Sequence, residues 1–127
     1  EVAGQFGLSV DPHVIETRFR NVFQARGGLA SLGDHSSEAL ERRWWRETVE
    51  LVFKGFGLPE QFEEFFEALY RRFGSREAWE LYPEVNSVLD RLKKSAFGLA
   101  VISNWDSRLL KLLDEFKLSP YFSRVLF

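Results

Sequence analysis

The sequence contains no cysteine, no methionine and only two histidines. The lack of cysteine excludes a disulfide framework, a thiolate metal site and a thiol nucleophile, and it is typical of a cytoplasmic protein. No apolar run approaches the roughly 20 residues that are needed to span a bilayer. The sequence also has no large excess of positive or negative charge. It contains 17 Lys and Arg and 19 Asp and Glu, which give a formal net charge of -2. We therefore expect a cytoplasmic protein that binds neither nucleic acid nor a membrane surface.

Helical patterns fill roughly the first 75 residues of a chain that is long enough for about one domain. Asp11-Pro12 is typical of a helix start and Gly27-Gly28 of a helix end. Ser36 or Ser37 can cap a second helix, and Pro59 is expected to open a third. The glutamates of this third helix fall on its polar side, so we interpret them as solvated and not as paired catalytic carboxylates. This part of the chain is predicted to be a small helical bundle.

Aromatic residues are abundant in the predicted bundle. Trp44 and Trp45 are adjacent in the second helix and point about 100° apart, so they can pack against two neighbouring elements. The alternative for this pair is an aromatic wall that faces a substrate. The 13 phenylalanines of the chain leave open a further role for the bundle, as a module that binds a partner helix.

From about residue 81 the pattern alternates between helix and strand. The pattern predicts an amphipathic helix over residues 85–94, an apolar strand over 97–102, a second helix over about 106–117 and a second strand over 122–127. This order predicts an α/β fold with a parallel sheet whose strands are buried on both sides. Because two strands do not make a stable sheet, we expect the remainder of the same protein or a partner chain to complete it.

Ser103 and Asn104 follow the first of these strands, at the place where open parallel sheets bind ligands. A hydroxyl group, the backbone N–H groups of the turn and a helix N-terminus together can hold a phosphate or carboxylate. The alternative is structural: Asp106 or Ser107 caps the next helix, and Ser103 ends the strand. Spacing alone favours this alternative.

Several segments together resemble the haloacid dehalogenase (HAD) superfamily of hydrolases. The resemblance to its second motif is carried by Tyr82-Pro83-Glu84-Val85, by Val88 to Lys93, and by Leu99 to Asn104. A narrower resemblance to the REG-2-like branch is carried by Gly33 to Ser37, by Arg42 followed by Trp44-Trp45, and by Ile102 to Asp106. The resemblance implies a helical (type 1) cap over residues 1–80 and part of a Rossmannoid parallel-sheet core over residues 81–127.

The resemblance also implies a phosphate-binding role for Ser103 and Asn104, through the serine hydroxyl and the next backbone N–H. Related enzymes use an aspartate nucleophile from an Asp-x-Asp motif, Mg²⁺, a lysine and a late acidic pair. The sequence contains no Asp-x-Asp, and it stops at Phe127, before the lysine is expected. We therefore expect an internal piece of a hydrolase that lacks the first, third and fourth motifs, holds no catalytic residue or Mg²⁺ ligand, and is inactive alone.

Supporting roles around the site are expected for Trp105, Asp106, His35, Trp45 and Arg42. His35 lies in a loop that matches the branch, whereas a zinc site is disfavoured because the sequence has no cysteine and no HExxH spacing. Arg42 can meet an anionic substrate as the helical part closes, although such arginines are usually surface charges.

Two classes of function follow. The first is Mg²⁺-dependent hydrolysis of a small phosphorylated substrate, with a hinge near residues 78–83. The second is the non-catalytic helical module described above. An alternative to the first function, within the same fold, is a 2-haloacid dehalogenase. In that enzyme Ser103 and Asn104 would hold a carboxylate.

Overall fold

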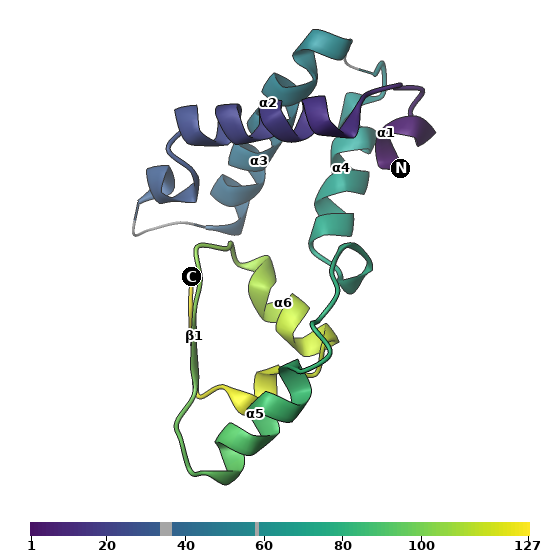
Figure 1. Cartoon of the computed structure of the whole chain (residues 1–127). Coiled ribbons are helices and arrows are strands. Elements are labelled where there is room, and N and C mark those ends of the chain that lie inside the picture. Colours follow the sequence, from purple (N-terminus) through teal and green to yellow (C-terminus); the bar gives the residue numbers. More distant parts are fainter. Residues whose placement is uncertain (34–36, 58) are drawn as a thin grey trace. The chain divides into compact units, whose positions relative to one another are not determined.

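The computed structural model describes residues 1–33, 37–57 and 59–127. Its internal contacts divide the chain into two compact units, Glu1–Arg71 and Arg72–Phe127, which are coloured from purple to teal and from green to yellow in Figure 1. Within the described residues, no helix combines the length and the hydropathy that crossing a membrane requires.

The first unit is helical. Its elements are α1 (Val2–Gln5), α2 (Pro12–Ala25), the 3-10 helix η1 (Leu29–Leu32), α3 (Glu38–Phe53), the 3-10 helix η2 (Lys54–Phe56) and most of α4 (Phe62–Phe73).

Local capping explains where these helices begin. Asp11 Oδ1 accepts the N–H of His13 at 2.8 Å and so caps α2. Ser37 Oγ accepts the N–H of Leu40 at 3.3 Å and caps α3. The alternative cap, Ser36, lies outside the described residues. The start predicted for the third helix at Pro59 is wrong, because α4 begins at Phe62 after a turn at residues 60–61.

Buried aromatic rings form the core of the first unit. Phe65 is fully buried and makes edge-to-face contacts with Phe53 and Phe6, with ring centroids 4.9 and 5.4 Å apart. Val2 and Val52 complete the buried cluster. The glutamates that the sequence predicts on the polar side of the third helix are exposed, as expected (Glu60, Glu63, Glu64 and Glu67).

The second unit contains the 3-10 helix η3 (Arg76–Ala78), α5 (Val85–Lys94), β1 (Ala100–Ile102), α6 (Arg108–Glu115), the 3-10 helix η4 (Ser119–Tyr121) and β2 (Arg124–Leu126). Strands β1 and β2 are parallel, and their register pairs Val101 with Val125. The prediction of an α/β fold with a helical bundle and part of a Rossmannoid core is therefore confirmed.

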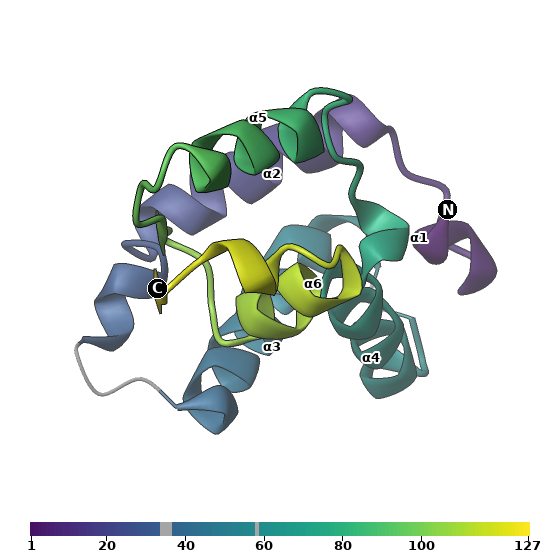
Figure 2. The same cartoon turned by 90° about the horizontal axis from the view of Figure 1, so that it is seen from below.

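Leucines of α6 pack against one face of this sheet. Leu109 and Leu113 are buried and, with Leu118, contact Val101 and Val125. The helix η4 lies beside both α5 and α6 (Figures 1 and 2). Two polar contacts join it to α5, since Tyr121 donates to Asp90 Oδ1 at 2.7 Å and Lys93 Nζ donates to the carbonyl of Pro120 at 2.9 Å.

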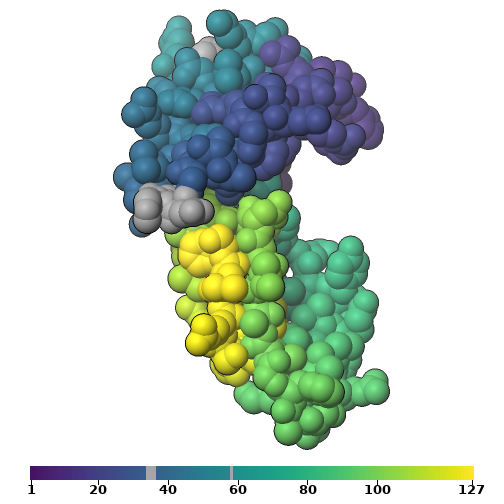
Figure 3. Space-filling model, turned by 90° about the vertical axis from the view of Figure 1, so that its left-hand side faces the viewer, coloured from purple at the N-terminus to yellow at the C-terminus, as the bar shows by residue number. Residues whose placement is uncertain are grey.

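The other face of the sheet is open, which corrects the prediction that the strands are buried on both sides. Ile102 is 84% exposed and Leu126 is 55% exposed. Figure 3 shows the β1 segment in green and the β2 segment in yellow, side by side at the surface of their unit. Within the described residues the sheet has two strands, and its helices supply apolar side chains to one face only.

Candidate functional site

The predicted anion-binding turn begins where β1 ends. The Ser103 N–H donates to the carbonyl of Leu126 at 2.9 Å, which continues the parallel pairing by one residue. Ser103 Oγ then accepts the N–H of Trp105 at 3.2 Å. Because the hydroxyl oxygen receives this bond, its own proton remains a donor for another group. Asn104, at the tip between these residues, is exposed.

Asp106 fixes the downstream side of the turn. Its carboxylate is 2% exposed, and Oδ1 accepts the backbone N–H of Arg108 at 3.1 Å and its Nε–H at 2.9 Å. Oδ2 accepts from Nη2 of the same arginine at 2.5 Å. The predicted helix-capping role of Asp106 corresponds to the bond with the Arg108 N–H, although α6 begins at Arg108 and not at Asp106.

The ion pair has an electrostatic consequence for the turn. A buried carboxylate two residues from Asn104 would repel an anion, but the guanidinium of Arg108 compensates its charge. Arg108 is a residue that sequence reasoning missed. Its position two residues after a capping aspartate was the signal that could have indicated it.

The Trp105 ring is held by a second tryptophan that the sequence did not single out. The ring centroids of Trp79 and Trp105 are 4.6 Å apart, with the planes at 66°. Trp79 lies in the segment between η3 and α5. Nothing in the local sequence pattern indicates this contact, because it joins two loops.

The supporting residues expected from the first unit are engaged within that unit. Trp45 stacks on Phe19 with ring centroids 6.2 Å apart and makes an edge-to-face contact with the buried Trp44 at 5.0 Å. Arg42 is ion-paired with Glu67. These contacts favour the packing role for both tryptophans. His35 lies outside the described residues.

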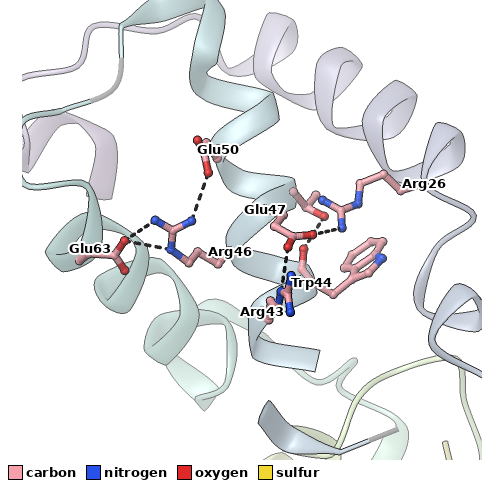
Figure 4. Close-up of polar contacts among 8 residues, drawn as sticks. Arg26, Arg43, Trp44, Arg46, Glu47, Glu50 and Glu63 are labelled. Carbon is pink, nitrogen blue, oxygen red and sulfur yellow. Dashed lines mark hydrogen bonds and ion pairs between the residues drawn. The ribbon is translucent and has the colours of Figure 1, made fainter. Parts of the chain in front are cut away.

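The other arginines of α3 are also paired with carboxylates (Figure 4). Arg43 Nε donates to Glu47 Oε1 at 3.1 Å, and Arg46 donates to Glu50 Oε2 at 3.1 Å and to Glu63 Oε1 at 2.9 Å. The bonds from Arg46 lower the pKa of Glu63. An incoming anion would have to compete with these carboxylates.

A groove of about 610 Å³ lies in the second unit, and its lining includes Arg76, Trp79, Glu115 and Lys117. Ser103 and Asn104 do not line it. Its charges have both signs, so they indicate no class of ligand.

The HAD superfamily generally implies a metal cofactor, and the described residues do not fit one. No group of three or more His, Asp or Glu side chains among residues 1–33, 37–57 and 59–127 is arranged to hold a metal ion. The described residues by themselves therefore supply no metal centre.

The chain consists of a helical unit and a parallel β-α-β unit, with a Ser-Asn turn at the end of β1. It is similar over most of its length to proteins of the haloacid dehalogenase-like branch, which confirms the resemblance that the sequence motifs indicate. No family model matches it.

The relatives are proteins named "Haloacid dehalogenase-like hydrolase domain-containing protein 3". The protein of this name from Xenopus laevis is 31% identical over 121 residues, which are 94% of this chain and 50% of the relative. Those from Homo sapiens and Mus musculus are 29% and 28% identical over 122 residues, 94% of this chain and 49% of each relative. The chain thus spans about half the length of these relatives.

Proposed function

We propose that this chain belongs to a Mg²⁺-dependent phosphoester hydrolase in which Ser103 and Asn104 bind the phosphoryl group of a small substrate. The observation that carries the proposal is the place of these two residues at the carboxyl end of β1, in a chain whose relatives are named hydrolases. That end of a parallel strand is where ligands bind in open α/β sheets.

The turn supplies donors for phosphoryl oxygens. The Trp105 N–H occupies a lone pair of Ser103 Oγ, so the hydroxyl proton is free to donate to a phosphoryl oxygen. The backbone N–H of Asn104, at the exposed tip, is a second donor. The compensated charge of Asp106 lowers the electrostatic cost of placing an anion beside it.

The turn orients a phosphoryl group but does not attack it. The hydrogen bond of Ser103 Oγ is to a backbone N–H, which is not a base, so the hydroxyl is not activated as a nucleophile. We propose that an aspartate from an Asp-x-Asp motif, absent from the printed sequence, performs the attack. Mg²⁺, when bound, would offset the charge of the phosphoryl group.

We also propose that the remainder of the same protein completes the sheet, with further strands at its edges and helices over its open face. Ile102 and Leu126 expose an apolar surface there, and the relatives are about twice as long as this chain. An exposed apolar sheet with free edges favours such pairing.

The interaction-module alternative would have to use other side chains than the core phenylalanines of the first unit. Phe53 and Phe65 are buried in that core and are not displayed to a partner helix, whereas Phe19 is 40% exposed. The dehalogenase alternative uses the same turn for a carboxylate, and substrate assays separate it from a phosphatase.

The proposed function is tested on the protein purified from its source, with a phosphomonoester and a 2-haloacid as parallel substrates, each with Mg²⁺ and with EDTA. We expect Mg²⁺-dependent release of phosphate and no release of halide. Ser103→Ala should lower kcat/KM for the phosphomonoester by roughly 100-fold, the usual cost of one lost donor to developing charge. Halide release, or an unchanged kcat/KM in Ser103→Ala, would overturn the proposal.

A further inference from the structure

Trp79 is a large aromatic residue whose contacts are not explained by the hydrophobic core. It is 36% exposed, and it does not belong to the cluster that Leu109, Leu113 and Leu118 form. An exposed tryptophan outside a core is unusual enough to ask what it contacts. Its contacts lie on two sides, at the end of α4 and at Trp105.

On one side Trp79 is attached to the end of α4. Its Nε1–H donates to the carbonyl of Phe73, the last residue of that helix, at 2.9 Å. The two rings also make an edge contact, with centroids 6.1 Å apart. The hydrogen bond satisfies one of the carbonyl groups that a helix leaves without an internal partner, so it fixes the indole in place.

On the other side Trp79 contacts the Ser103–Asn104 turn through one residue. Its ring meets the ring of Trp105 at 4.6 Å in an edge-to-face arrangement. The backbone N–H of Trp105 is the donor to Ser103 Oγ. A displacement of the Trp105 ring would therefore move the N–H that orients the serine hydroxyl.

We propose that Trp79 is a positioning residue, which acts through Trp105 to hold the Ser103–Asn104 turn in the geometry that binds an oxyanion. The inference rests on the function proposed for that turn. Trp79 holds the turn through the Trp105 ring, and the Asp106–Arg108 pair holds its downstream end. Because the indole is also bonded to Phe73, the end of α4 and the geometry of the turn are linked.

The test uses the 127-residue chain labelled with ¹⁵N and two readouts. The first is the hydrogen-exchange rate of the Trp105 amide, compared with the free energy of unfolding in urea. The second is the Kd for inorganic phosphate, taken from the shifts of the Ser103 and Asn104 amide signals. Tyr82→Ala is the matched control, because Tyr82 is an aromatic residue of the same connecting segment and is 77% exposed.

We expect Trp79→Ala to accelerate exchange of the Trp105 amide and to raise the Kd for phosphate, each about three- to tenfold, the factor that corresponds to the usual worth of an aromatic pair. Trp79→Phe keeps a ring and should recover most of both losses, whereas Tyr82→Ala should change neither. If Trp79→Ala unfolds the second unit, the same two readouts are compared between Trp79→Leu, which lacks a ring, and Trp79→Phe, which keeps one.

Two results would overturn the inference. One is that Trp79→Ala, or Trp79→Leu in its place, matches Tyr82→Ala in both readouts. The other is a change in which every amide of the second unit accelerates in parallel with a lower free energy of unfolding, which indicates a structural role alone. Phosphate that shifts no amide of the unmodified chain refutes the proposed function of the turn instead, and the exchange of the Trp105 amide then still decides whether Trp79 holds it.

Discussion

Arg26 Nη2 lies 2.7 Å from Glu47 Oε2, and this ion pair joins the residue that follows α2 to α3 (Figure 4). Glu47 also accepts from Arg43 on its own helix. The carboxylate therefore carries two guanidinium partners, and it connects the polar surface of α3 to the neighbouring helix.

The first prediction concerns acid. The hydrogen bonds from Arg26 and Arg43 lower the pKa of Glu47 below its ordinary value of 4.5. A carboxylate with a lowered folded-state pKa stabilises the fold above the unfolded-state pKa, and this stabilisation is lost as the pH falls through the folded-state pKa. We expect the Tm to be constant near neutral pH and to fall below about pH 4.5.

Glu47→Gln tests the assignment of this acid dependence. The variant should lose part of the slope of Tm against pH below about pH 4.5, because glutamine does not titrate. Glu16→Gln is the control, since Glu16 pairs with Arg20 on the exposed surface of α2. Identical slopes in the two variants would contradict the prediction. The ion pairs of Glu47 with Arg26 and Arg43 are partly exposed. Added salt should therefore weaken the acid dependence that they cause.

The second prediction concerns the buried carboxylate beside the turn. Arg108→Met removes the guanidinium from Asp106 and leaves its charge buried, which should lower the free energy of unfolding of the second unit by about 3 kcal/mol. Urea denaturation measures the loss. Lys111→Met breaks an exposed pair with Glu115 and should cost less than about 1 kcal/mol. Equal losses in the two variants would show that the Asp106–Arg108 pair stabilises the fold no more than an exposed ion pair does.

The third prediction concerns the aromatic core of the first unit. Phe65 is fully buried, so Phe65→Ala should lower the free energy of unfolding by about 3–5 kcal/mol through lost burial and the cavity left behind. Phe73 at the end of the same helix is 48% exposed, and Phe73→Ala should cost well under half as much. Urea titration followed by circular dichroism compares them, and a reversed order would place the core elsewhere.

The fourth prediction concerns the open sheet face. Because Ile102 is 84% exposed on β1, Ile102→Lys should reduce self-association of the 127-residue chain with little change in Tm. Light scattering after size exclusion measures the association. Val14→Lys, at an exposed apolar position of α2, should leave it unchanged. Self-association that persists in Ile102→Lys would exclude this face as its cause.

Much of the fold was predictable because it depends on neighbours in the sequence. Asp11 and Ser37 cap their helices through N–H groups two and three residues away, and such caps can be read from the sequence. The order of helix and strand after residue 81 likewise predicted the parallel pairing of β1 and β2. The start of α4 was missed by three residues because a turn follows Pro59.

The candidate site was predictable in part for the same reason. A hydroxyl and an amide at the end of an apolar strand are visible in the sequence, and so is an aspartate just before the next helix. Whether this turn binds a phosphoryl group stays a prediction. The pairing of Asp106 with Arg108 is local, but burial decides its strength, and burial depends on residues distant in the chain.

The sequence by itself determined the longer helices, the parallel strand pair and the place of Ser103 and Asn104 at a strand end, because periodicity and capping act over a few residues. The tertiary structure decided which charges and rings meet. Arg46 bonds Glu63 of another helix, and Trp79 meets Trp105 from another loop. Such contacts depend on how the elements pack, and spacing along the chain does not encode that packing.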